Sequence, residues 1–211
     1  FAENFWHYRS NPLSRSLSMG GICEDGLSCI IVGISGFGRH IGVGASYGAF
    51  LSPLGHIAAR VHAISQQMKQ ELDPAPYSTV ILQCGHAGMK TGEDGPTHAD
   101  PQAYQLHAEN YAPDTAITLT PWEPQEIWPL MAAGLKARPA VLVPFVTRPN
   151  EPILDRVSLG LAPASGAVAG LYCLSEPSCS VDLDGVVVLQ GSGVTLVFVN
   201  DVLPKLKQKG I

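Results

Sequence analysis

The chain has little charge and no long apolar run. Only 15% of its 211 residues are charged and its formal net charge is −5, so we expect no basic surface for nucleic acid or acidic membranes. No apolar stretch approaches the roughly 20 residues that a membrane-spanning helix needs, and the opening Phe-Ala-Glu-Asn does not resemble a secretory signal. These features predict a cytoplasmic protein. Because the first residue is not methionine, we also expect a trimmed or partial chain.

Paired cysteines are lacking as well. The five cysteines, at positions 23, 29, 84, 173 and 179, are odd in number and form no Cys-x-x-Cys motif, which indicates reduced thiols rather than disulfides or a zinc site. The 45% hydrophobic content with 22 glycines and 17 prolines is typical of a loop-rich α/β protein and not of a disordered chain. The length suffices for one domain and a fragment of a second.

Short apolar runs alternate with segments of helical periodicity. The runs at residues 29–33, 77–82, 116–119 and 140–146 predict buried strands, and residues 51–72, 101–109 and 123–136 predict helices. The clearest helix is 51–72, where Ile57, Val61, Ile64 and Met68 recur at helical spacing on one face. The alternation predicts an α/β fold with a mainly parallel sheet covered by helices on both faces.

The chain changes character near residue 149. Prolines and small residues crowd residues 149–184, which predicts an interdomain linker. A strand at 186–189, a turn at Gly191-Ser192-Gly193 and a helix at 194–209 then indicate the partial start of another domain at 185–211. The Gly-Ser-Gly turn favours a tight strand-to-helix connection over a phosphate loop. Residues 1–28 are predicted to be an irregular lead-in, and 29–148 the main domain.

The densest set of chemically active side chains lies in residues 86–98. These thirteen residues contain three glycines, a proline, two acids, a lysine and two histidines. They follow the apolar run 77–82 and would emerge from the end of a buried strand, where ligands collect in open α/β sheets. A polar loop stiffened by proline and held by a rigid strand is a common way of positioning a substrate. The pattern predicts a substrate loop.

Residues 92–98, Gly-Glu-Asp-Gly-Pro-Thr-His, with a histidine six positions before Gly92, resemble the substrate loop of transketolases. Residues 33–38, Gly-Ile-Ser-Gly-Phe-Gly, are similar to the family's Gly-Ile-Arg-Glu-Phe-Gly, and residues 48–51, 120–124 and 141–148 are similar to further motifs. The similarity covers 29–148, the family's pyrimidine-binding domain, and more weakly 185–210, the start of its C-terminal domain.

The resemblance implies transfer of a two-carbon ketol unit between sugar phosphates with thiamine diphosphate and magnesium. Each site in the family is built across two subunits, so a homodimer or a partner chain carrying the diphosphate-binding domain is implied. His86 and His98 match substrate-side catalytic histidines, Asp94 matches an acid that binds a substrate hydroxyl, and Arg148 matches an arginine that grips a phosphate. The plainer alternatives are a capped loop, a turn-forming aspartate and a structural salt bridge.

The cofactor-facing positions depart from the family. Gly36 stands where the family has the glutamate that activates the cofactor, beside Phe37, and after Leu51 the stacking aromatics are replaced by residues such as Ile57. Glu24 or Asp25 could compensate for Gly36. No metal and diphosphate segment is recognised, so no metal ligand is assigned.

Three hypotheses therefore remain open. The chain is part of a transketolase-like enzyme, a non-catalytic paralogue that binds a sugar phosphate or a partner subunit, or a metal-dependent hydrolase. The third hypothesis would use mixed histidines and acids whose spacing matches no compact ligand motif: His86, His98, His107, Asp94 and Asp100.

Overall fold

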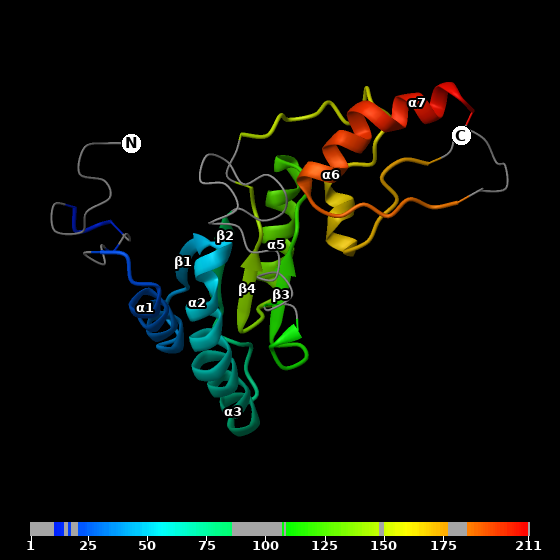
Figure 1. Ribbon diagram of the computed structural model, residues 1–211. Helices are drawn as coiled ribbons and strands as arrows, with labels where there is room; N and C mark the ends of the chain where they lie inside the picture. The colour runs from blue at the N-terminus through cyan, green and yellow to red at the C-terminus, as the bar shows by residue number, and fades with distance from the viewer. Residues whose placement is uncertain are drawn as a thin grey trace.

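A computed structural model describes residues 11–14, 17, 21–85, 107, 109–147, 150–176 and 185–210. Its centre is a sheet of four parallel strands in the order β1-β2-β4-β3 (Figure 1). The strands are β1 (Gly42–Tyr47), β2 (Val80–Gly85), β3 (Ala116–Leu119) and β4 (Val141–Pro144). The predicted α/β class with a parallel sheet is confirmed.

The register aligns the strand ends at one edge of the sheet. Gly42 of β1 pairs with Val80 of β2, and Tyr47 pairs with Gly85 at the other end of the same ladder. Val80 also pairs with Val141 of β4, and β3 and β4 pair from Ala116–Val141 to Leu119–Pro144. Because all four strands run the same way, the segments that follow them meet at this carboxyl edge.

Helices cover the two faces of the sheet (Figure 1). One face packs against α1 (Glu24–Gly36) and against one continuous helix made of α2 (Leu51–Ile57), a π-helical segment (Ala58–Ala63) and α3 (Ile64–Leu72). The other face packs against α5 (Ile127–Ala137), which follows a 3-10 turn (Pro124–Glu126).

The alternation of side chains along β2 explains the two layers. Val80 and Leu82 are completely buried in the cluster that contains Leu51 and Leu54 of α2. Ile81 belongs instead to the cluster of Leu130 on α5. Successive strand residues point to opposite faces, so one apolar run supplies both halves of the core.

Residues 29–33 were predicted as a strand, and this is wrong, because they lie inside α1. Their apolar run is as short as a strand, but Ser28, Ile31, Val32 and Ser35 are the buried positions, which is the spacing of a helix face. The strand that precedes α2 is β1, at 42–47. A short apolar run does not distinguish the two structures by periodicity alone.

The helix predicted at 51–72 is present, but its apolar row is not its buried face. Val61, Ile64 and Met68 are 53%, 48% and 64% exposed. The buried positions are Leu54, Ala58 and His62, with Gln66 one turn further. Polar and small residues therefore form part of the inner surface of this helix.

The C-terminal part begins with an extended segment. Residues 185–190 have no regular secondary structure, so the strand predicted at 186–189 is wrong. The helix predicted at 194–209 is present as α6 (Ser192–Val197), a π-helical segment (Phe198–Val202) and α7 (Leu203–Gln208). Among the described residues, no helix is both long and apolar enough to cross a bilayer.

Residues 150–176 contact both parts of the chain. They contain one 3-10 helix, Ala164–Ala169. Leu161 shares a buried cluster with Trp122, which follows β3, and with Val199 of the C-terminal helical region. The boundary of a second domain in this region stays a prediction.

Candidate functional site

β2, the strand that precedes the predicted substrate loop in the sequence, ends with Gly85 at the carboxyl edge of the sheet. His86, Asp94, His98 and Arg148 all lie outside the residues that the structure describes. Their roles stay predictions.

An acidic side chain, Glu24, lies at the carboxyl edge. Glu24 is the first residue of α1 and is half-buried. Ser46, the penultimate residue of β1, donates a hydrogen bond from its Oγ to Glu24 Oε1 over 3.2 Å. A carboxylate is thus fixed beside the strand ends, at the edge where parallel sheets bind ligands.

Gly36 and Phe37, predicted to face the cofactor, lie at the opposite end of α1. The preceding Ser35 donates to the carbonyl oxygen of Thr79 over 2.8 Å and accepts from the amide of Gly42 over 2.7 Å. Thr79 and Gly42 stand at the beginnings of β2 and β1, which is the amino edge.

Twelve helical steps separate Glu24 from Gly36, or about 18 Å along the axis. The structure does not bring Gly36 or Phe37 to the edge that carries Glu24. Phe37 is 74% exposed, and its ring faces the Arg39 guanidinium at 5.6 Å from the ring centroid. Ile57 is also turned away from open space, since it packs against the main core cluster.

The same sequence pattern occurs at both ends of α1. Residues 21–26 read Gly-Ile-Cys-Glu-Asp-Gly, so the pattern Gly-Ile-x-x-x-Gly occurs twice, twelve residues apart. The earlier copy has a glutamate, Glu24, in its fourth position, and the later copy has Gly36 there. The two copies could be distinguished only by knowing which end of α1 meets the carboxyl edge.

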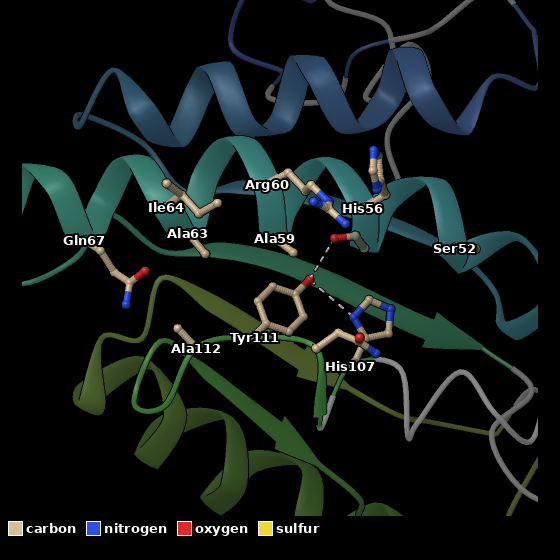
Figure 2. Close-up of a pocket in the computed structure, with 12 residues that line it drawn as sticks. Ser52, His56, Ala59, Arg60, Ala63, Ile64, Gln67, His107, Tyr111 and Ala112 are labelled. Carbon is tan, nitrogen blue, oxygen red and sulfur yellow. Dashed lines mark hydrogen bonds between the residues drawn. The ribbon is translucent and has the colours of Figure 1, made fainter.

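A cleft of about 420 Å³ lies between the helix 51–72 and residues 107–112. Figure 2 shows the helix on one side, with Ser52, His56, Ala59 and Arg60, and His107 and Tyr111 on the other. The remaining lining residues are Gly55, Ala63, Ile64, Gln67, Asn110 and Ala112. Small side chains along the helix leave the space open.

His107 is completely buried in the wall of this cleft. Its ring stacks on Tyr111, with 5.9 Å between ring centroids, and meets Phe145 edge-on at 6.2 Å. The Tyr111 hydroxyl donates to the carbonyl oxygen of Gly55 over 3.3 Å and lies 3.4 Å from Nδ1 of His107. Burial lowers the pKa of His107 from 6.5 to about 4 and raises that of Tyr111, so both groups are neutral at pH 7.

The structure gives no support to a metal centre around His107. Within the part of the chain that it describes, no group of three metal-ligating side chains occurs. The other four residues of the hydrolase hypothesis, at positions 86, 94, 98 and 100, lie outside the described residues.

A buried ion cluster holds residues 150–176 against the start of α5. Arg156 donates from Nε to Glu123 Oε1 and from Nη2 to Glu126 Oε1, each over 2.8 Å. Its guanidinium also lies 4.9 Å from the ring centroid of Trp122, and Tyr172 donates to Glu126. Every charge in the cluster is paired. Its role is to fix this segment, as buried pairs with full hydrogen bonding can.

No family model and no curated protein matches the sequence. Solved structures do match: crystal structures of two transketolase mutants from Pichia stipitis superpose with TM-scores of 0.65 and 0.64 at 21% sequence identity. The matches cover 90% and 89% of this chain but only 25% and 24% of those chains. The chain thus has a transketolase-like fold and spans about a quarter of the length of these neighbours.

Proposed function

We propose that the chain is the pyrimidine-binding part of a transketolase-like assembly that transfers a two-carbon ketol unit between sugar phosphates. The observation that carries the proposal is the position of Glu24. A half-buried carboxylate, held by Ser46, stands at the ligand-binding edge of a sheet that resembles transketolase in its fold.

Glu24 fits the pyrimidine end of thiamine diphosphate. In transketolases, which the sequence resembles, a glutamate hydrogen-bonds the pyrimidine ring and promotes the tautomer that activates the cofactor. When bound, the cofactor supplies an acidic thiazolium carbon. Glu24 would hold a proton at a pyrimidine ring nitrogen, and Ser46 would orient the carboxylate by donating to Oε1.

The other end of the cofactor needs residues that hold a metal ion and the diphosphate. The described residues include no group of three side chains suited to a metal ion. We therefore assign magnesium and the diphosphate to a second copy or a partner chain. His86, His98, Asp94 and Arg148 are proposed to bind the sugar phosphate.

A non-catalytic paralogue that binds a sugar phosphate or a partner subunit is the alternative. It was motivated by Gly36 in place of an activating glutamate. The absence of a carboxylate at position 36 is weaker support for this alternative, because Gly36 lies at the amino edge of the sheet and Glu24 at the carboxyl edge.

The proposal is tested on the protein purified from its natural source together with whatever co-purifies. We expect the assembly to transfer a ketol unit from a ketose phosphate to an aldose phosphate only with thiamine diphosphate and magnesium. The separated chain should bind thiamine diphosphate negligibly in calorimetry, since its described residues include no group of three side chains that could hold the metal ion of a diphosphate anchor. An assembly without thiamine-dependent transfer would favour the paralogue, and tight magnesium-dependent binding by the chain alone would refute the shared site.

A further inference from the structure

The described lining of the cleft beside His107 contains basic side chains, although the chain as a whole has a negative formal charge. Acids outnumber bases 18 to 13 in the sequence, yet none of the twelve described residues that line the cleft is acidic. Arg60 and His56 lie one helical turn apart on its helix side (Figure 2), a spacing that brings the two side chains together. The cleft therefore favours an anion.

Arg60 is available to such a ligand. In the part of the chain that the structure describes, the buried ion pairs belong to Arg156, and no carboxylate lies within ion-pair distance of Arg60. Its guanidinium has donors that fit a carboxylate or a phosphate in pairs.

His107 supplies a second, independent feature. When the Tyr111 hydroxyl donates to Gly55, the tautomer with the hydrogen on Nδ1 of His107 lets that nitrogen donate to the tyrosine oxygen. Nε2 is then a lone-pair acceptor, and it has no hydrogen-bond partner although it is completely buried. A buried acceptor without a donor is unfavourable. A hydroxyl group entering the cleft would satisfy it.

The imidazole edge lies directly under the helix. A Cβ at Gly55 would stand 2.6 Å from Cε1 and 3.1 Å from Nε2 of His107. Glycine at this position lets the ring reach the helix wall, so a ligand reaches Nε2 only if the two walls separate.

We propose that this cleft binds a small organic anion that also carries a hydroxyl group. Arg60, with His56 beside it, holds the carboxylate or phosphate, and the hydroxyl donates to Nε2 of His107. The ligand body rests on Ala59, Ala63 and the Tyr111 ring. This binding goes beyond ketol transfer and does not depend on it.

The test uses the full chain and three probes in calorimetry and in nitrogen-15 NMR of the histidine rings. Glycerol 3-phosphate and glycerate carry an anion and a hydroxyl, and their relative affinities distinguish a phosphate from a carboxylate ligand. Propyl phosphate lacks the hydroxyl. We expect one of the first two to bind and to shift the Nε2 resonance of His107, and propyl phosphate to bind more weakly without that shift.

Two arginine variants provide the matched comparison. Arg60→Gln should weaken binding at least about tenfold, because it removes a charge-assisted contact. Arg39→Gln removes an equally exposed arginine near Phe37 and should leave the affinity unchanged. Equal losses in the two variants, no binding of either hydroxylated probe, or a His107 resonance that no probe moves would each overturn the proposal.

Discussion

Buried His107 should make the protein sensitive to acid. Its pKa is about 4 in the folded protein and 6.5 in the unfolded reference, because burial disfavours the charged imidazole. Between these two values the unfolded chain binds the proton more readily than the folded protein does. The free energy of unfolding must therefore fall as the pH falls.

The pKa difference sets the size of this loss. At about 1.4 kcal/mol for each pH unit of difference, His107 should remove about 3 kcal/mol of stability between pH 7 and pH 4. The free energy of unfolding of a small domain is typically about 5 to 15 kcal/mol, so this loss is a large part of it. His62 is also buried, and burial lowers its pKa, so it adds to the same trend.

The assay is urea unfolding at several pH values between 4 and 7, for the unmodified chain and two variants. His107→Phe keeps a ring against Tyr111 and Phe145 but cannot titrate, so its stability should depend on pH less steeply, by about 3 kcal/mol over this range. His56→Gln serves as the control variant, because it removes an exposed histidine instead of a buried one. If His107→Phe and the unmodified chain lose the same free energy of unfolding between pH 7 and pH 4, within about 1 kcal/mol, then His107 is not the source of the pH dependence.

Two further predictions concern packing. Arg156→Met should lower the free energy of unfolding by about 3 to 5 kcal/mol, since it leaves Glu123 and Glu126 buried without a cation. The control Arg138→Met changes an exposed arginine and should alter the free energy of unfolding by less than about 0.5 kcal/mol. Equal effects of the two variants in urea unfolding would contradict a stabilising role for the buried ion cluster. Gly55→Ala should destabilise by about 1 to 3 kcal/mol, because the new Cβ would meet the His107 ring at 2.6 Å. In the control Gly36→Ala the new Cβ would meet nothing within 4 Å, so this variant should be the more stable of the two. A lower melting temperature for Gly36→Ala than for Gly55→Ala would be evidence against the packing of His107 on Gly55.

Much of the architecture follows from the sequence. The strands at 116–119 and 141–144 and the helices at 51–72 and 127–137 lie where apolar periodicity predicts them, and their alternation implies the parallel sheet. Residues 29–33 mislead because four or five apolar residues fit a strand and a helix equally well. The exposed row at Val61, Ile64 and Met68 misleads because His62 and Gln66 are buried in its place. His62 and Gln66 each form a hydrogen bond with the backbone of Ser78, and the sequence does not reveal these contacts.

The candidate site was only partly predictable. The strand that precedes the predicted loop at 86–98 could be recognised from its apolar residues, since β2 does end at Gly85. The sequence does not decide between Glu24 and Gly36 as the cofactor-facing position, because both follow a Gly-Ile pair and only the direction of α1 separates them. The cleft at His107 joins a helix to residues about 50 positions later in the chain, a contact that no local pattern encodes.

Glu24 is proposed to activate thiamine diphosphate at the carboxyl edge. The most direct measurement is hydrogen–deuterium exchange at the thiazolium carbon in the purified assembly, with Glu24→Gln compared to Asp25→Asn and Gly36→Glu. We predict that Glu24→Gln slows exchange by about a hundredfold or more, the usual size of a lost acid–base contribution, while the other two folded variants exchange normally. Normal exchange in Glu24→Gln, or faster exchange in Gly36→Glu, would contradict the account.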